Sequence, residues 1–407
     1  MVLNSLFLRL FLLSALLVAG CANSQPEATQ VASTLAPGDG SAIPATAQST
    51  PLVGAPTHTP APLVSTPPTE ATPIANPTAV VAPPQTIPGL IGPDNFPAGV
   101  NPLTGLMVDD PARLNRRPLA IKISNYPQVV RPQSGLNNAD LIFEHYAEGG
   151  VTRFTAIFYG NDADPVGSVR SGRLIDLEIP KMYDAAFAYS GASGPVRLML
   201  RDSPFFDRII SPDFGHGGFF RVEDPAKAVE HTLFTNTGTL RAILQERGVD
   251  TAPQFPTNMA FLPEAPSGGT PASSIEVRYV GTNAFWRFDP ITGGYMRSTD
   301  GNAHVDANTG LQLNFKNIIV VAAHHEDTDI LEDLVGGGHY SIQIQVWGEG
   351  PVSIFRDGQR FDGRWRRENP NDMLTFYDLE GNILPLAPGN SFFELVPLGF
   401  TGLVVTD

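Results

Sequence analysis

Arginines and glutamates gather beside turn glycines in one stretch of the chain, although only 16% of its 407 residues are charged. Arginine side chains in loops fork onto phosphate or carboxylate groups, and glutamates balance such charges or accept hydrogen bonds from hydroxyls. The stretch therefore predicts a site for an anionic or hydroxylated ligand. The candidate ligand-binding residues are Arg131, Ser134, Glu144, Glu148, Thr152, Arg153, Arg170, Ser171 and Arg173.

Three further groups of residues could carry chemistry, but each has a simpler interpretation. His216 lies in a Gly-His-Gly-Gly run that lacks the Gly-x-Ser-x-Gly partner of an esterase, which indicates a flexible turn. His324 and His325 precede several carboxylates, yet adjacent side chains of a strand point to opposite faces, so we expect an acidic, solvated turn and no metal site. Four arginines around Trp365 indicate a surface hairpin or a surface that stacks on sugar rings. No phosphate-binding or dinucleotide-binding glycine motif occurs, and no cofactor is expected.

The first twenty-one residues predict where the protein is located. Arg9 precedes an apolar run that is too short to span about 30 Å of hydrocarbon, so residues 1–20 are expected to be a signal peptide. Small residues precede Cys21, the single cysteine, as in the lipobox of bacterial lipoproteins. We therefore expect acylation of Cys21 and an extracytoplasmic protein that this lipid anchors to the bacterial cell membrane.

The composition of the next segment predicts a spacer rather than a domain. Residues 21–98 are rich in Pro, Thr and Ala, and no Lys or Arg occurs between Arg9 and Arg113, so a disordered linker is expected. The formal net charge of −15 argues against nucleic acid as a partner. A single cysteine excludes a disulfide framework and a cysteine-ligated metal.

Beyond the linker, apolar periodicity predicts two folded parts. Residues 99–252 alternate like strands at 119–124, 140–146 and 152–159, with Glu148-Gly149-Gly150 as a hairpin turn. Helices are expected from 174 to Pro180, after Asp224-Pro225, and from about 240 to Gly248. Residues 253–274 form a connection rich in Pro and Gly, and residues 275–407 contain short β-type runs. The expected fold class is α+β, with a mixed N-terminal domain and a mostly β C-terminal domain.

The arginine-rich stretch also resembles a known family. The Pro-Gln-Ser-Gly-Leu run at 132–136, the Glu-Gly-Gly-Val-Thr-Arg-Phe run at 148–154 and the Val-Arg-Ser-Gly-Arg run at 169–173 look like those of the bacterial YerB-like lipoproteins. The domain of this family is of unknown function and has an N-terminal and a C-terminal part. The likeness continues through 285–317 and 375–397 and covers roughly residues 101–400. It implies a lipoprotein of the cell envelope and brings no established activity.

Three functions stay open for such a protein. The first is binding or scaffolding of an anionic or hydroxylated envelope ligand, such as a glycan or a phosphate-bearing polymer. The second is a hydrolase or transferase on envelope polymers with Glu144 or Glu148 as general acid or base. Paired carboxylates cleave glycosides when they lie about 5–9 Å apart, whereas four residues along a strand span roughly 13 Å. The third is a protein-binding adaptor, which predicts an exposed apolar patch. The arginines and glutamates could also form an internal network that pins the hairpin to the following helix.

Overall fold

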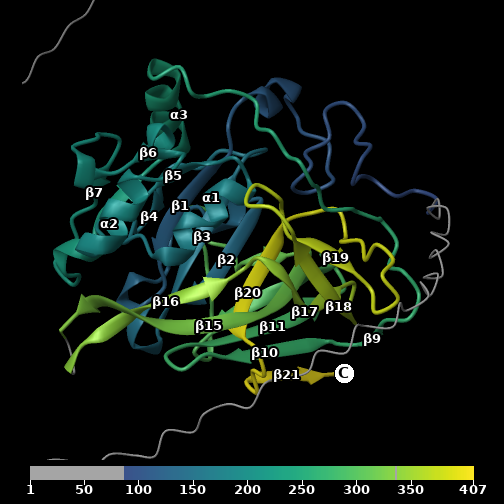
Figure 1. Ribbon diagram of the computed structural model, residues 1–407. Helices are drawn as coiled ribbons and strands as arrows, with labels where there is room; N and C mark the ends of the chain where they lie inside the picture. Colours follow the sequence, from purple (N-terminus) through teal and green to yellow (C-terminus); the bar gives the residue numbers. More distant parts are fainter. Residues whose placement is uncertain (1–86, 335–336) are drawn as a thin grey trace, which may run out of the picture. The chain divides into compact units, whose positions relative to one another are not determined.

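Three strands that the alternating apolar residues predict form the middle of a large sheet. They are β1 (Leu119–Ser124), β2 (Leu141–Tyr146) and β3 (Thr152–Phe158), and β3 pairs antiparallel with both of the others. The computed structural model describes residues 87–334 and 337–407 (Figure 1). The predicted signal peptide, Cys21 and most of the predicted linker lie outside these residues. Residues 87–98 of the linker lie inside them and pack on the body, where Ile91 and Phe261 exchange two backbone hydrogen bonds of 2.8 Å.

The predicted hairpin between β2 and β3 is confirmed. Its connection contains the one-turn 3₁₀ helix η4 (Glu148–Gly150). Gly149 and Gly150 adopt φ values of 68° and 74°, which L side chains rarely adopt. The Gly-Gly pair therefore permits the sharp reversal that places Glu148 beside the start of β3.

The large sheet joins strands from both predicted parts of the chain. Its main order is β19-β18-β17-β15-β20-β2-β3-β1-β5-β6, while β16 pairs with β15 and β9 pairs with β18. β20 (Ser391–Pro397) runs parallel to β2 and places Glu394 opposite Glu144. The other strands are β5 (Ala186–Ala188), β6 (Ile209–Ile210), β9 (Thr270–Pro271), β15 (Asn317–Asp333), β16 (His339–Gln345), β17 (Gly348–Arg356), β18 (Gln359–Arg367) and β19 (Thr375–Tyr377).

A second sheet, built from residues 274–406, covers one face of the large sheet (Figure 1). Its strands are β10 (Ser274–Arg278), β11 (Asn283–Asp289), β12 (Gly294–Thr299), β13 (Asn302–Ala303), β14 (Asn314–Phe315) and β21 (Leu403–Thr406). The rings of Trp286, Phe315 and Phe392 meet edge to face between the sheets, with centroids 4.8–6.1 Å apart. A small third sheet contains β4 (Val166–Gly167), β7 (Phe220–Arg221) and β8 (Leu233–Thr235).

Short helices cover the opposite face of the large sheet. They include η5 (Leu174–Leu177), α1 (Ile179–Met182) and α2 (Gly194–Arg201), whose apolar side chains share one buried core with Phe143 of β2. α3 (Thr237–Glu246) packs with the core between the sheets. The remaining 3₁₀ helices are η1 (Pro111–Asn115), η2 (Gln128–Val130), η3 (Leu136–Asn138), η6 (Phe206–Arg208), η7 (Pro212–Phe214) and η8 (Val229–His231). Within the described ranges helices are few and short, so the fold is α+β but rich in strands.

The helix predicted before Gly248 is confirmed as α3, the helical run predicted from residue 174 is confirmed as η5 and α1 except for its end, and no α-helix forms after Asp224-Pro225. α3 ends just before Gly248, whose φ of 71° is that of a terminating glycine. Pro180 does not end the run that begins at 174, because it stands in the first turn of α1, where proline is tolerated. After Asp224-Pro225 only a turn forms, since the residues that follow are mostly exposed and offer no apolar face to bury. The sequence patterns also do not predict α2.

The acidic stretch after His324 is a strand, so the prediction of a turn was wrong. It extends β15, and β16 pairs with it from His324 opposite Gln345 to Asp333 opposite His339. Backbone pairing with β16 therefore fixes a conformation that the acidic composition alone did not indicate. We call this part of the β15–β16 hairpin, residues 324–334 and 337–345, the arm (Figure 1).

Candidate functional site

The nine candidate residues do not form one group, because the β2–β3 hairpin places Glu144 and Arg153 on opposite faces of the large sheet. The register of the hairpin places His145 opposite Arg153 and Glu144 opposite Phe154, and side chains alternate along a strand. Arg153 therefore lies on the face covered by η5, α1 and α2, and Glu144 lies on the face covered by the second sheet. The residues brought together with Arg153 are Glu148, Arg170, Ser171 and Arg173, whereas Arg131, Ser134, Glu144 and Thr152 are not part of this group.

Glu148 binds two of the arginines. Its carboxylate accepts hydrogen bonds from Arg153 Nη2 at 2.7 Å and from Arg173 Nε at 2.5 Å, and it also contacts Arg173 Nη2. Although burial raises it, the charges of Arg153 and Arg173 lower the pKa of Glu148 to about 2. Arg153 also donates to the Ser171 carbonyl at 3.1 Å. These bonds fasten the hairpin turn to the loop before η5, as the internal-network interpretation predicts.

A buried lysine supports this cluster from the strands. Lys122 Nζ lies 2.8 Å from Asp176 Oδ2 and 2.6 Å from His145 Nε2, and burial lowers the pKa of Lys122 to about 8. His145 Nδ1 lies 2.9 Å from the Tyr146 carbonyl, so a neutral ring with its proton on Nδ1 satisfies both contacts. Burial and the charge of Lys122 hold the pKa of His145 well below its usual value. Asp176 Oδ2 also accepts from the backbone N–H of Arg173 at 2.7 Å, which fixes the loop that carries Arg173.

The arm brings a second carboxylate to the arginines. Glu332 lies 3.6 Å from Arg173 Nη1, and its side chain is 2% exposed. The Ser193 hydroxyl, directly before α2, donates to Glu332 at 3.1 Å, and the Ser341 hydroxyl contacts the same oxygen. Glu332 is one of the carboxylates after His325 that were expected to form an acidic turn, and the structure places it as a counter-charge to Arg173, about 160 residues earlier.

Arg170 differs from its two neighbours. Its backbone pairs with Lys122 and Ser190, but within residues 87–334 and 337–407 its half-buried guanidinium makes no hydrogen bond and no ion pair. Burial and the charge of Arg173 lower the pKa of Arg170, while the exposed Glu230 opposes that effect. We define the arginine cluster as Arg153, Arg170, Arg173, Glu148 and Glu332. It contains three guanidiniums and two carboxylates, an excess of one positive charge.

The other four candidates make hydrogen bonds to other parts of the protein. Glu144 is fully buried and accepts from Arg297 Nη2 at 2.6 Å and from Thr152 Oγ1 at 2.6 Å. Arg131 donates to Asp300 at 2.6 Å and borders a cavity of about 330 Å³. Ser134 exchanges backbone hydrogen bonds with Gly167 at 2.9 and 3.2 Å. Glu144 and Thr152 are therefore inaccessible to a ligand in this conformation.

A second buried carboxylate, Glu394, lies beside Glu144 and was not among the residues predicted from the sequence. Glu394 accepts from Trp286 Nε1 at 2.8 Å and lies 2.8 Å from Tyr279 Oη. Burial and the charge of Glu144 raise the pKa of Glu394 to about 8. A glutamate inside the otherwise apolar run Phe392 to Val396 is the one sequence signal of this site. Lys122, inside the apolar strand β1, is the corresponding signal on the other face.

The other groups singled out in the sequence do not assemble into sites. His324 is exposed and His325 half-buried, and no group of three or more His, Cys, Asp or Glu side chains suited to a metal occurs among the described residues. Trp365 is 2% exposed and donates to the Ala322 carbonyl at 2.8 Å, so it cannot stack on a sugar. His216 lies in a loop after η7, next to Gly215 with a φ of 76°.

Comparison with known proteins identifies the family. A model of the N-terminal domain described as "Protein of unknown function (DUF3048)" matches residues 103–250, and the model of its C-terminal domain matches residues 275–393. The chain belongs to this two-part family, which confirms the resemblance seen in the motifs.

The YerB protein of Bacillus subtilis resembles this chain both in sequence and in structure. The protein of strain 168 named "Putative lipoprotein YerB" is 29% identical over 301 residues, which cover 73% of this chain and 86% of that protein. The crystal structure of the Bacillus subtilis YerB protein matches with a TM-score of 0.63 and 26% identity, over 75% of this chain and 99% of the other. In the described part of the present chain, no helix has the length and apolar character needed to cross a membrane.

Proposed function

We propose that the protein binds an anionic ligand of the cell envelope at the arginine cluster. The observation that carries this proposal is the guanidinium of Arg170, which makes no hydrogen bond and no ion pair among the described residues, while Arg153 and Arg173 share Glu148. A phosphate or carboxylate group beside Arg170 would balance the excess charge and accept two parallel hydrogen bonds. A phosphate-bearing polymer or an acidic glycan offers such groups.

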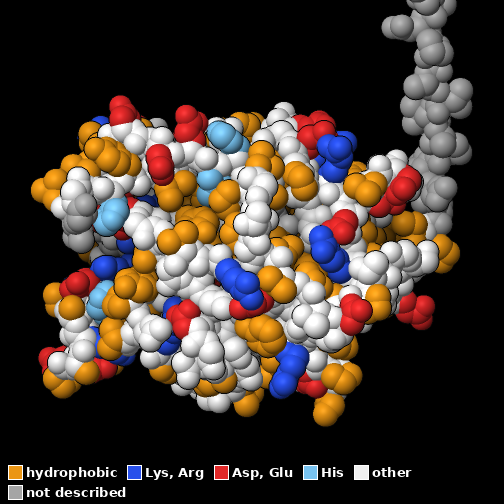
Figure 2. Space-filling view, turned by 90° about the horizontal axis from the view of Figure 1, so that it is seen from below, with side chains coloured by type: hydrophobic (Ala, Val, Ile, Leu, Met, Phe, Trp, Pro, Cys, Tyr) orange, Lys and Arg blue, Asp and Glu red, His pale blue; other side chains and the backbone are white. Residues whose placement is uncertain are grey.

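The attraction must be local to the cluster. The chain as a whole has a formal net charge of −15, so its bulk field repels polyanions. On the face seen in Figure 2, basic and acidic side chains are scattered among apolar ones without one large basic area. Binding should therefore depend on a few charge-assisted hydrogen bonds and weaken as salt is added.

The hydrolase alternative finds less support than binding. Glu144 is buried on the face of the sheet opposite to Arg153, so it cannot share a substrate with Glu148. Glu148 has a pKa of about 2 and stays ionised, which is unsuited to a general acid. The adaptor alternative keeps one supporting feature, a cavity of about 270 Å³ beside the exposed side chains of Met199 and Trp347.

The proposal is tested by binding to the full chain in detergent micelles. Glycerol phosphate and a purified wall-polymer fraction are titrated into the wild type, Arg170→Ala and Arg287→Ala, at low and at high salt. Arg287 is an exposed arginine of β11 without an ion pair in the described residues, so it is the matched control. We expect Arg170→Ala to lose about tenfold or more in affinity, the usual effect of a lost charge-assisted hydrogen bond. Equal affinities of Arg170→Ala and wild type would refute the proposal.

We also infer that lipid on Cys21 anchors the protein outside the cytoplasm. The lipobox-like residues before Cys21 and the name of the Bacillus relative support this inference. Cys21→Ala should abolish acylation and leave the protein unprocessed or released, with an unchanged thermal midpoint of the folded body. Membrane fractionation measures the first effect, and persistent membrane association after normal cleavage would contradict the inference.

A further inference from the structure

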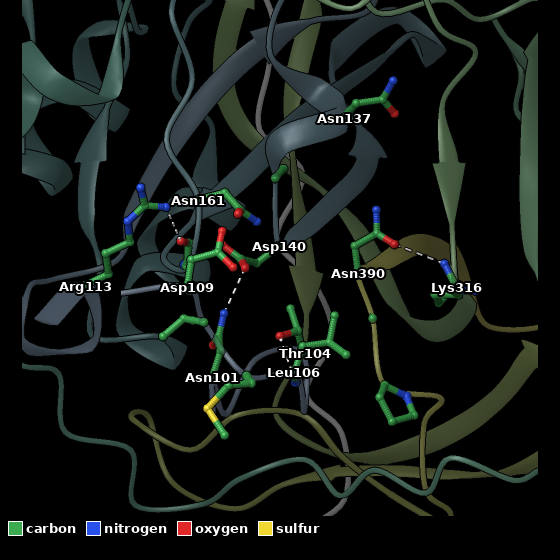
Figure 3. A pocket seen from close by; sticks show the side chains of 16 residues that line it. Asn101, Thr104, Leu106, Asp109, Arg113, Asn137, Asp140, Asn161, Lys316 and Asn390 are labelled. Atoms are coloured by element: carbon green, nitrogen blue, oxygen red, sulfur yellow. Dashed lines mark hydrogen bonds between the residues drawn. The ribbon is translucent and has the colours of Figure 1, made fainter. Parts of the chain in front are cut away.

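A cavity of about 340 Å³ lies where strands of the large sheet begin (Figure 3), and none of its lining residues belongs to the arginine cluster. Three lining residues directly precede strands of the large sheet: Asp140 precedes β2, Lys316 precedes β15 and Asn390 precedes β20. Two more, Gly160 and Asn161, follow the end of β3. Because β2 and β15 both run parallel to β20, the N-terminal ends of the three strands lie at the same end of the sheet. The cavity is thus lined by residues of both family domains, and its volume suits a small ligand.

The floor of the cavity is held in place by a buried carboxylate. Asp140 accepts hydrogen bonds from Asn101 Nδ2 at 2.9 Å and from the backbone N–H groups of Tyr159 at 2.6 Å and Gly160 at 3.1 Å. A Cβ atom at Gly160 would lie 2.7 Å from Asn101 Nδ2, so only glycine permits this close approach. The floor of the cavity is therefore preformed, which lowers the entropic cost of binding.

Several polar groups of the lining are free to bind a ligand. Within the described ranges, the side chains of Asp109 and Asn161 make no hydrogen bond and no ion pair. Arg113 uses Nη1 for the Gly160 carbonyl at 3.0 Å and keeps further N–H donors. Asn137 donates through Nδ2 to Thr309 at 3.2 Å, while its Oδ1 accepts nothing there. The unused donors of Arg113 and the unused polar atoms of Asp109 and Asn161 thus line the same cavity.

Charges of both signs line the cavity, because Arg113 and Lys316 are cationic and Asp109 and Asp140 are carboxylates. The Lys316 ammonium donates to the Thr292 and Gly293 carbonyls, so the lining offers no net positive charge that would select an anion. A hydroxyl group donates one hydrogen bond and accepts others, so a neutral ligand with several hydroxyls suits such a lining. Leu106 and Met107, which are 48% and 63% exposed, add an apolar wall for a C–H face or a methyl group.

We propose that this cavity binds a neutral saccharide that carries an acetamido group. The hydroxyls bind Asp109, Asn161 and Arg113, and the acetamido methyl contacts Leu106 and Met107. This site is independent of the proposed anion site at Arg170, since none of its lining residues belongs to the arginine cluster.

The test is calorimetric titration of N,N′,N″-triacetylchitotriose, a neutral trimer with three acetamido groups that is called chitotriose below, into the full chain in detergent micelles. The variants are Asn161→Ala and Asp109→Asn, with Asn371→Ala as control, because Asn371 is likewise exposed and makes no hydrogen bond within the described residues. We expect Asn161→Ala and Asp109→Asn to weaken binding at least fivefold, and Asn371→Ala and Arg170→Ala to bind like the wild type. Thermal midpoints verify that the exposed substitutions leave the fold intact.

Cellotriose, which has hydroxyls in place of the acetamido groups, tests the apolar wall. We expect it to bind more weakly than chitotriose. Absence of chitotriose binding, equal binding by all variants, or cellotriose binding as tight as that of chitotriose would overturn the proposal. If Arg170→Ala loses phosphate binding and keeps chitotriose binding, the two sites are separate.

Discussion

At the scale of single residues, the buried carboxyl group of Glu394 makes the stability of the fold depend on pH. Glu394 and Glu144 face each other in the core between the sheets, and Arg297 pairs with Glu144 while its guanidinium lies 4.9 Å from the centroid of the Phe392 ring. Two ionised carboxylates at this place would repel each other in a medium of low polarity. Burial therefore keeps Glu394 protonated at neutral pH, hydrogen-bonded to Trp286 and Tyr279.

The variant Glu394→Gln tests this assignment. The folded-state pKa of about 8 lies above the ordinary value of 4.5, so between these pH values the folded chain holds a proton that the unfolded chain releases. The free energy of unfolding should therefore fall as the pH rises through this window. Gln stays neutral while it keeps a donor and an acceptor, so the variant should lose this fall and be more stable than the wild type above pH 8. Thermal midpoints at pH 5.5, 7 and 8.5 measure it, and the same pH dependence in both proteins would be inconsistent with a buried, neutral Glu394.

At the scale of elements, the arm sets the charge of the arginine cluster. Glu332 reaches Arg173 only because β15 continues beyond β17 and pairs with β16. The contact to Ser193 also joins the arm to the start of α2. The carboxylate of the arm thus lowers the positive charge that an external anion would meet at the arginine cluster.

Replacing Glu332 with Gln should raise the affinity for anions. The substitution keeps the shape and the hydrogen-bond acceptor but increases the excess charge of the cluster from one to two. Glycerol phosphate should bind at least about threefold more tightly, a free-energy change typical of one partly screened charge. Asp327→Asn removes the same charge from an exposed position of the arm and should have a smaller effect. Unchanged or weaker binding by Glu332→Gln would argue that the anion binds elsewhere.

The sequence predicts local elements well and distant partners poorly. The β2–β3 hairpin follows from alternation and a Gly-Gly turn, both of which lie within twenty residues. Alternation also implies that Glu144 shares a face of the sheet with Phe154 and not with Arg153. The separation of Glu144 from Arg153 could therefore be predicted from the sequence pattern. No local signal pairs β2 with β20 or brings Glu332 to Arg173, because those contacts depend on packing across more than 150 residues.

At the scale of the whole described body, the two family domains share one sheet. β20 lies between β15 and β2, so the C-terminal part supplies the neighbour on which β2 depends. Phe393 stacks on Phe143 with ring centroids 4.3 Å apart. Without residues 253–407, Phe143 and one edge of β2 would be exposed to water.

We therefore expect the body to unfold in one transition. Far-UV circular dichroism, which reports both parts, and tryptophan fluorescence, which reports Trp286, Trp347 and Trp365 of the C-terminal part, should give the same midpoint in guanidinium chloride. A fragment of residues 87–252 should fail to fold. Two separate transitions, or a folded fragment, would show that the domains are independent.

The central claim, an anion site at Arg170, is tested most directly by crystals of the protein grown with selenate. Selenium gives an anomalous signal that locates the anion without reference to the surrounding protein. The account predicts a peak within hydrogen-bond distance of the Arg170 guanidinium, and loss of this peak in Arg170→Ala crystals grown in the same way. Ordered selenate at other positions together with an empty Arg170 would contradict it.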